Sequence, residues 1–271
     1  DILSGLVGSE MCIRDSRIFD HMMLDGLEDA YEAGRSMGTF GEDCAAKYSF
    51  TREQQDAFAT ASVQRAKAAT ESGAFAAEIV PVTVKTREGE TVVSVDEGPG
   101  KVKLEKIATL KPAFKKDGTI TAASSSSIND GAAALVMMRE STAKKLGCKP
   151  VARIVSHATH AQEPEWFATA PLGATQKALT KAGWQVGDVQ LWEINEAFAV
   201  VPMALMKELD LPHDKVNVNG GACALGHPIG ASGARIMVTL IHALKARGLT
   251  KGLATLCIGG GEATAVALEL V

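Results

Sequence analysis

The chain has 271 residues and a mass of 28.4 kDa, which is enough for a large hydrophobic core and for one to three domains. Its 28 Lys and Arg residues face 32 Asp and Glu residues, so its formal net charge is −4. This balance excludes a general attraction to nucleic acid or to an anionic membrane surface. The sequence contains no apolar run of membrane-spanning length, so we expect no membrane segment.

The cysteines indicate the compartment. They are scattered and form no Cys-x-x-Cys pair: Cys12, Cys44, Cys148, Cys223 and Cys257. An odd number of widely spaced cysteines favours neither a disulfide framework nor a zinc site. The first residues also lack the basic and apolar regions of a secretory signal. We therefore expect a reducing compartment, the cytoplasm, and no metal.

The N-terminal part begins with an irregular segment. Residues 1–16 follow neither the helical nor the strand period for long and look foreign to the rest of the chain. From Ile18 onward, apolar residues recur at roughly helical spacing as far as Gly34, which would end that segment. A second helix is predicted to start near Thr39, because Thr39 and Glu42 have the spacing of a capping box.

The clearest helix of this half is predicted over Arg52–Glu71. Thr51 is placed to cap it, Gln54 completes a capping box, and Gly73 is a suitable stop. A short strand is predicted at Ile79–Lys85.

The middle of the chain is polar and then apolar. Lysines are frequent between positions 101 and 116, where a solvated loop is favoured over a phosphate-binding patch. Thr121–Asp130 is rich in serine, so it is either a linker or a segment that presents hydroxyl and amide groups to a ligand. Ala132–Met138 is predicted to be a buried strand because it is a continuous apolar run.

The remaining chain alternates strands with helices. Strands are predicted at 151–156, 189–194, 216–218, 253–258 and 263–270, and helices at 172–182, 196–209 and 233–247. Asn195 and Ser232 are expected to be N-caps of the last two helices. The order βαβαβαββ predicts an α/β fold with a mixed, mainly parallel sheet layered with helices. Ligands would bind in the loops at the carboxyl ends of its strands.

Three such loops hold candidate reactive groups. Cys257 ends a predicted buried strand and precedes the triplet Gly259–Gly261, a pattern that most often means a core cysteine and a tight turn. Alternatively, the thiol faces a site in which glycine N–H groups stabilise an oxyanion. His227 lies among glycines in a loop before a helix, where structural and acid–base roles are about equally favoured. Asn195 either caps a helix or donates its amide into the same space.

Taken together, these loops resemble the three C-terminal signature blocks of the thiolase family. The blocks are Asn195-Glu196-Ala197-Phe198, the glycine-rich run Gly220–Arg235 that contains His227-Pro228, and Cys257-Ile258-Gly259-Gly260-Gly261. The resemblance extends from about residue 18 to the C-terminus. It implies a thiolase-like fold of two related α/β halves with an inserted loop domain. It also implies an acyl-CoA C-acyltransferase that makes or cleaves a carbon–carbon bond between acyl units on coenzyme A, so coenzyme A is a substrate and no cofactor is expected.

The resemblance also implies roles for individual residues. His227 would activate the nucleophilic cysteine and help to bind a thioester oxygen, and Cys257 would be the acid/base. Asn195 would position a water in a first oxyanion hole, and the Gly259 amide would lie in a second. The residues expected to bind the pantetheine and acyl parts of the substrate are Met37, Leu110, Phe114, Ala122, Ser126, Phe167, Ala197 and Phe198. The partners implied are CoA, acyl-CoA and further copies of the chain, as a dimer or a tetramer.

Some positions depart from the family pattern. Ser36 stands where many relatives have histidine, and Phe167 where some bacterial members have methionine, so the acyl chain length is left open. The family's Cys-Gly-Ser-Gly-like nucleophile motif does not occur, and the sequence around Cys12 does not resemble it. We therefore expect that most of the N-terminal half is missing, that the C-terminal half is complete, and that the chain alone is inactive.

The expected domains follow from that interpretation. Residues 1–16 would be a non-matching segment such as an error of sequence assembly produces, and 17–128 the loop domain that binds CoA. Residues 129–148 would be the remnant of the N-terminal domain, and 149–271 the C-terminal domain. The alternative is a catalytically inactive acyl-CoA-binding or partner subunit of the same superfamily. A ketoacyl synthase is a weaker option, because the block around Cys257 has the thiolase form.

Overall fold

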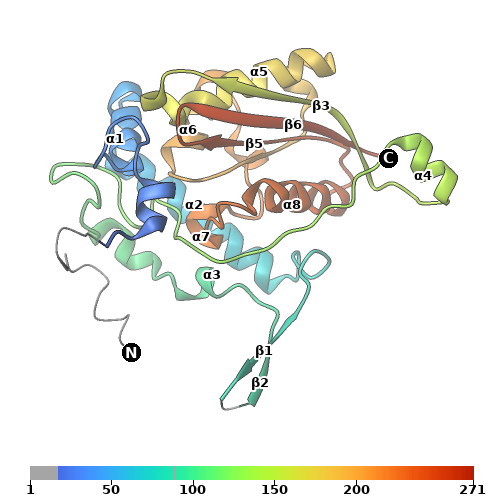
Figure 1. Cartoon of the computed structure of the whole chain (residues 1–271), viewed down its shortest axis with the longest axis horizontal. Coiled ribbons are helices and arrows are strands. Elements are labelled where there is room, and N and C mark those ends of the chain that lie inside the picture. Colours follow the sequence, from blue (N-terminus) through green and yellow to red (C-terminus); the bar gives the residue numbers. More distant parts are fainter. Residues whose placement is uncertain (1–17, 88) are drawn as a thin grey trace.

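The computed structural model of the chain describes residues 18–87 and 89–271, so our interpretation of residues 1–16 lies outside it (Figure 1). Its centre is a four-stranded sheet with the strand order β3-β6-β5-β4. The strands are β3 (Ala152–Ala161), β4 (Leu191–Ile194), β5 (Lys251–Ile258) and β6 (Glu262–Leu270). The mixed α/β architecture that the sequence predicts is therefore present.

The sheet is less parallel than expected. Only β4 and β5 pair in parallel, whereas β6 is antiparallel to both β5 and β3. The reason is the tight turn Gly259–Gly261, which returns the chain directly beside β5. Gly260 and Gly261 have φ values of 89° and 87°, and a Cβ on Gly261 would lie 2.2 Å from the carbonyl oxygen of Gln162. Glycine is thus required for this hairpin.

Helices cover both faces of the sheet (Figure 1). On one face α5 (Ala170–Ala182) packs on a core that contains Trp192 and Leu253. On the other, α8 (Ser232–Ala246) packs through Ile236, Leu240 and Leu244 on neighbouring strand residues. Because consecutive strand residues point to opposite faces, β4 contributes to both cores. α5 ends before Gly183, which has a φ of 68°, as its sequence predicts.

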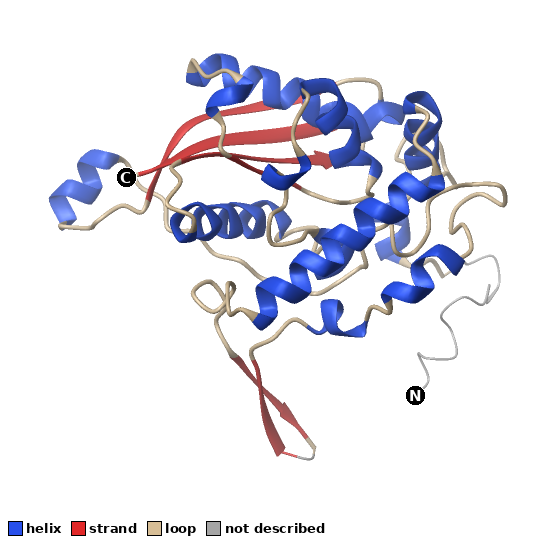
Figure 2. Ribbon diagram, turned by 180° about the vertical axis from the view of Figure 1, so that it is seen from behind, coloured by secondary structure: helices blue, strands red, loops and turns tan. Residues whose placement is uncertain are grey.

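The remaining elements lie around this layered core (Figure 2). The helices are η1 (Met23–Leu27), α1 (Met37–Tyr48), α2 (Arg52–Glu71), α3 (Glu97–Lys101), η2 (Leu104–Thr109), α4 (Glu140–Leu146), η3 (Pro164–Thr169), η4 (Val186–Asp188), α6 (Val200–Leu209), η5 (His213–Lys215) and α7 (Ala222–Leu225). The hairpin of β1 (Val82–Thr86) and β2 (Gly89–Val93) projects away from the body, and only its first strand was predicted. No helix of the described residues is long and apolar enough to cross a bilayer.

Helix α2 confirms the sequence prediction. It covers Arg52–Glu71, and both bonds of the capping box form: the Gln54 amide donates to Thr51 Oγ1 at 3.3 Å, and the Thr51 amide to Gln54 Oε1 at 3.0 Å. Helix α1 instead begins two residues earlier than Thr39. The Thr39 hydroxyl donates to the carbonyl of Ser36 at 2.7 Å, so it does not cap the helix.

Residues 132–138 do not form the predicted buried strand. They have no regular structure, and the side chains of Val136 and Met137 are 89% and 69% exposed. The apolar run predicted burial, but no strand of the described chain pairs with it. The predicted strand at 216–218 is also absent as a strand, and Val216 makes only an isolated bridge to Trp192.

Candidate active site

Asn195 lies in a loop at the carboxyl end of β4 and does not cap a helix. Helix α6 begins at Val200, four residues later than its apolar pattern predicts. The Asn195 side chain is buried, and its Nδ2 lies 3.2 Å from His227 Nε2. Its Oδ1 has no hydrogen-bond partner. The amide therefore faces the imidazole and keeps a buried acceptor free for a further group.

His227 is held from its other side by Ser232. We expected Ser232 to cap α8, but the N-cap position belongs to Ala231. Ser232 Oγ instead lies 2.6 Å from His227 Nδ1 and donates to the carbonyl of Pro228 at 3.0 Å. Because the Pro228 carbonyl can only accept, the hydroxyl accepts the Nδ1 proton. The lone pair of the ring is thereby placed on Nε2, where the Asn195 amide donates.

The electrostatic environment favours the neutral imidazole. Burial, together with the positive charge of Arg235, lowers the pKa of His227 to about 4. At neutral pH the ring is therefore uncharged, with Nε2 as its acceptor. A group in this state can take a proton from a thiol.

Cys257 ends β5 and is buried in an aromatic cluster. Phe40, Phe167 and Phe198 belong to this cluster, and Met37 packs against it. Burial raises the pKa of the Cys257 thiol to about 12, so the sulfur keeps its proton at neutral pH. The thiol is therefore a proton donor in the resting site.

Gly259 follows Cys257 in the exposed turn between β5 and β6. A Cβ built on it would lie 3.6 Å from Met37 Sδ. Met37 is at the start of α1. Two predicted site residues that are far apart in the sequence, Met37 and Gly259, are thus neighbours.

The serine run joins two of the three loops. The amide and the hydroxyl of Ser126 both donate to the carbonyl of Ala197, at 3.0 and 3.1 Å. The next carbonyl, that of Ser127, accepts from the His227 amide at 3.0 Å. The run also makes an isolated bridge between Ser125 and Phe198. It is therefore packed against the loops of Asn195 and His227 and is not a linker.

The other predicted binding residues divide into two groups. Phe114 meets Phe198 edge to face with ring centroids 5.7 Å apart, so it lines the same cluster. Leu110 is half-buried, and its carbonyl accepts from Arg52 Nη2 at 2.9 Å. Ala122 is exposed. Within the described chain, neither Leu110 nor Ala122 is hydrogen-bonded to His227 or packed against it.

Sequence reasoning missed the support of these loops. Glu196 is fully buried and accepts from Ser62 Oγ at 2.7 Å, Asn217 Nδ2 at 2.7 Å and the Cys223 amide at 3.0 Å. It thus ties the Asn195 loop to α2 and to the run before His227. A charged residue two positions after a buried strand is the signal that could have drawn attention to it.

The position of the nucleophile is not filled by a described cysteine. Cys44, Cys148, Cys223 and Cys257 are free thiols, and none of these four hydrogen-bonds to His227. Cys12 lies outside the described residues. In the described ranges, no group of three or more His, Cys, Asp or Glu side chains is arranged to hold a metal ion.

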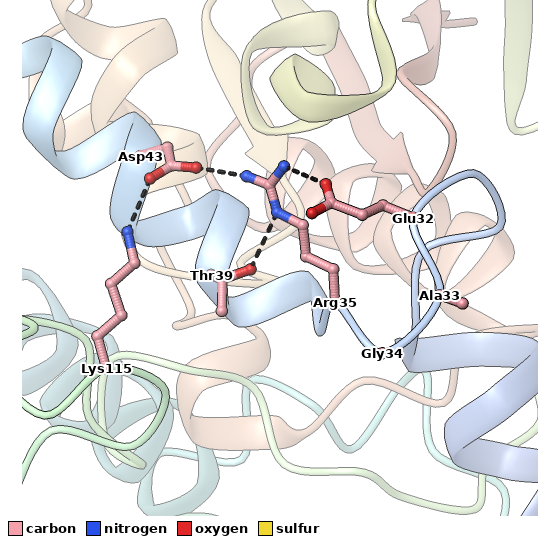
Figure 3. Close-up of a pocket in the computed structure, with 7 residues that line it drawn as sticks. All are labelled: Glu32, Ala33, Gly34, Arg35, Thr39, Asp43 and Lys115. Atoms are coloured by element: carbon pink, nitrogen blue, oxygen red, sulfur yellow. Dashed lines mark hydrogen bonds and ion pairs between the residues drawn. The ribbon is translucent and has the colours of Figure 1, made fainter.

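A hollow of about 420 Å³ lies beside the start of α1 (Figure 3). Its charged side chains form a chain of ion pairs in which Glu32 and Asp43 bind Arg35, and Asp43 also binds Lys115. None of the predicted site residues lines it. Because its charges satisfy one another, we assign no chemistry to this hollow.

Comparison with known proteins adds family information. The family model "Thiolase, N-terminal domain" matches residues 5–141, and "Thiolase, C-terminal domain" matches residues 148–270. An acetyl-CoA acetyltransferase of Rhizobium meliloti is 51% identical over 256 residues, and one of Escherichia coli K12 is 53% identical over 256 residues. Each match covers 94% of this chain and 65% of the relative.

Solved structures agree with these sequence matches. The crystal structure of the Bacillus anthracis acetyl-CoA acetyltransferase aligns with a TM-score of 0.90 and 46% identity, over 95% of this chain and 66% of that one. A thiolase of Ascaris suum in complex with coenzyme A aligns with a TM-score of 0.86 and 40% identity, over 97% of this chain and 67% of that one.

The comparisons correct one expectation about domain content. We expected most of the N-terminal half to be missing, but the N-terminal family model matches residues 5–141, which is about half of the chain. That expectation is therefore not borne out. The chain spans about two thirds of the length of the curated relatives, at 65% for those named above.

Proposed function

Because the chain belongs to the thiolase family, we propose that it acts as an acyl-CoA C-acyltransferase of the acetyl-CoA acetyltransferase type. The reaction is the reversible condensation of two acyl-CoA molecules to a 3-ketoacyl-CoA, or its thiolysis. Coenzyme A is a substrate, and no further cofactor is required. We place the enzyme in the cytoplasm as a homo-oligomer, a dimer or a tetramer.

The arrangement that carries this proposal is the hydrogen-bonded series Asn195, His227 and Ser232. It leaves a neutral imidazole with its acceptor at Nε2, 3.2 Å from the Asn195 amide. In thiolysis, Nε2 takes the proton of a nucleophilic thiol, which none of the four described cysteines supplies, and the sulfur of that thiol attacks the 3-keto carbon of the substrate. The orphaned buried Oδ1 of Asn195 supports its role of holding a water near the oxygen on which negative charge develops.

Cys257 completes the proton transfers. When the carbon–carbon bond breaks, the departing acetyl-CoA carbanion takes the thiol proton of Cys257. The resulting thiolate removes the proton from the incoming CoA thiol, whose sulfur then takes the acyl group. The nucleophile leaves as a thiolate, and the His227 imidazolium returns its proton to it. The high pKa of the buried thiol supports this proposal because the sulfur keeps its proton at neutral pH and its thiolate is a strong base, and we assign the Gly259 amide to a thioester oxygen.

The pantetheine arm is proposed to run along the aromatic cluster. Met37, Phe167, Phe198 and Phe114 supply apolar and aromatic surface there. Ser126 and Ala197 form its polar edge, because they are hydrogen-bonded to each other. Leu110 and Ala122 remain binding residues that only the family resemblance predicts.

Calorimetric titration of the chain with CoA tests the binding part of the proposal. Ser126→Phe is expected to weaken CoA binding about tenfold or more, because the ring would occupy space beside Ala197. Ser141→Phe is the control, because Ser141 is exposed on α4. Equal affinities of the two variants would remove Ser126 from the binding surface.

An assay of acetoacetyl-CoA thiolysis tests the catalytic part. Turnover by the 271-residue chain supports the proposed enzyme. CoA binding without turnover favours the alternative of an inactive binding or partner subunit. Against that alternative, the chain has His227, Cys257 and Asn195, and its relatives at about 50% identity are named acetyl-CoA acetyltransferases.

A further inference from the structure

A second polar link connects β4 with α8 beside the Asn195–His227 pair. Glu193 lies in β4, two residues before Asn195, which directly follows the strand. Arg235 lies three residues after Ser232, on the same side of the helix. Glu193 Oε2 and Arg235 Nη1 are 3.6 Å apart, and Glu193 is only 1% exposed.

Segments from the first half of the chain also meet at Arg235. Glu78 follows α2, and its Oε1 accepts from Thr239 on α8 at 3.4 Å. Asp96 precedes α3. Burial raises the pKa of Glu193, Glu78 and Asp96, and the charge of Arg235 opposes each rise. The positive charge of one guanidinium therefore favours the ionised form of three carboxyl groups, which come from three parts of the chain.

The pairing within this cluster is incomplete. Glu193 Oε1 and Glu78 Oε2 are buried without a hydrogen-bond partner, and the same holds for Arg235 Nη1. The negative charges of Glu78 and Glu196 disfavour ionisation of Glu193, so Arg235 is the opposing positive charge on it. A buried carboxylate without such a partner is strongly destabilising.

We propose that Arg235 is a positioning residue for His227, because its buried contact with Glu193, at 3.6 Å, holds the first turns of α8 on β4. Ser232 and Asn195 then meet the imidazole from its two sides. This role rests on the proposed function, since the position of His227 matters to a reaction only if the histidine takes part in one. The charge of Arg235 also reaches the ring and favours its neutral form, which provides a readout beyond stability.

Titration of His227 by NMR in the full chain tests this role. The pKa of His227, about 4 in the unmodified chain, is expected to rise by about one unit or more in Arg235→Met. Arg235→Lys keeps the charge and is expected to stay within about half a unit of the unmodified value. Lys245→Met is the control, because it removes an exposed cation from the last turn of α8. An unchanged His227 titration in folded Arg235→Met overturns the proposal.

A second variant keeps the proposal testable if Arg235→Met does not fold. Glu193→Gln preserves shape but removes the ionic link. Hydrogen exchange of the first-turn amides of α8 is expected to accelerate about tenfold or more, with no change in its last turn. If the exchange rates at the two ends of α8 change by the same factor relative to the unmodified chain, the positioning role is overturned. These measurements need no turnover, so loss of CoA binding or thiolysis in the unmodified chain would contradict the proposed function alone.

Discussion

Strand β5 and residues 132–138 are both short apolar runs, yet only β5 is buried. β5 lies between β4 and β6, and Leu253 in its middle has no exposed surface. Residues 132–138 cross the surface as an extended segment toward α4, and Val136 is 89% exposed (Figure 1). The difference is the presence of strands on both sides, which satisfy the backbone of β5. Apolar composition alone therefore does not place a segment in the core.

β5 and the segment of residues 132–138 also differ in how they contribute to the candidate site. Cys257 is the seventh residue of β5, so its sulfur is positioned by a strand with two neighbours. The segment that contains residues 132–138 contacts the site at its start, where Ile128 bridges to His227 and Gly131 lies against Pro228. Beyond Ile128 it contributes no predicted site residue. The following changes test this contrast, in order of decreasing expected effect.

The largest effect is expected from Leu253→Ala. Removing a fully buried leucine from the middle of β5 leaves a cavity between the sheet and α5, which typically costs about 2–5 kcal/mol. Urea denaturation measures this loss of unfolding free energy. A loss below about 1 kcal/mol would mean that the core of the sheet can collapse around the change.

Cys257→Ser tests whether Cys257, at the end of β5, takes part in catalysis or is only a core residue. Thiolysis of acetoacetyl-CoA is expected to slow about a hundredfold or more, because a serine hydroxyl is a much weaker acid than a thiol. Cys148→Ser, at an exposed thiol after α4, is expected to keep the unmodified rate. If Cys257→Ser is also nearly as fast as the unmodified enzyme, Cys257 is a core residue only.

Glu78→Gln tests the α8 side of the sheet through its pH dependence. Burial raises the pKa of Glu78 to about 7, so between its ordinary value of 4.5 and about 7 the folded chain binds more protons than the unfolded chain. This carboxyl therefore reduces stability as the pH rises through that window. The variant should gain about 1–2 kcal/mol relative to the unmodified chain between pH 5 and pH 8.

The control for this measurement is Glu140→Gln, on the exposed helix that follows residues 132–138. Its carboxyl pairs with Lys144 on the surface, and its removal is expected to leave the pH dependence above pH 5 unchanged. Parallel pH profiles for Glu78→Gln and the unmodified chain would show that Glu78 titrates like an ordinary surface carboxyl.

The smallest effect is expected from Val136→Ser. The side chain is almost fully exposed, so the free energy of unfolding should change by no more than about 0.5 kcal/mol. Solubility should improve, because an exposed apolar group is removed. A destabilisation comparable to that of Leu253→Ala would mean that the segment is packed in solution, and the contrast with β5 would fail.

The sequence predicted the elements whose signals are local. Thr51 and Gln54 cap α2 through bonds that span three residues, and Gly183 ends α5 through its own φ angle. It also pointed to Asn195, His227 and Cys257, because each stands at the end of a strand or among glycines. The sequence did not predict that Asn195 lies outside α6 and does not cap it, or that Ser232 contacts His227. These outcomes depend on loops that meet only in the folded chain.

The sequence by itself therefore determined the capped start of α2, the end of α5, the apolar runs and the chemical groups available for a thiolase-like site. Tertiary structure decided which apolar run became a strand, why two of the three strand pairings of the main sheet are antiparallel, and how the amide of Asn195 faces His227. The physical reason is range: caps and turns are satisfied within a few residues, whereas strands, buried charges and hydrogen-bonded side chains need partners from distant parts of the chain.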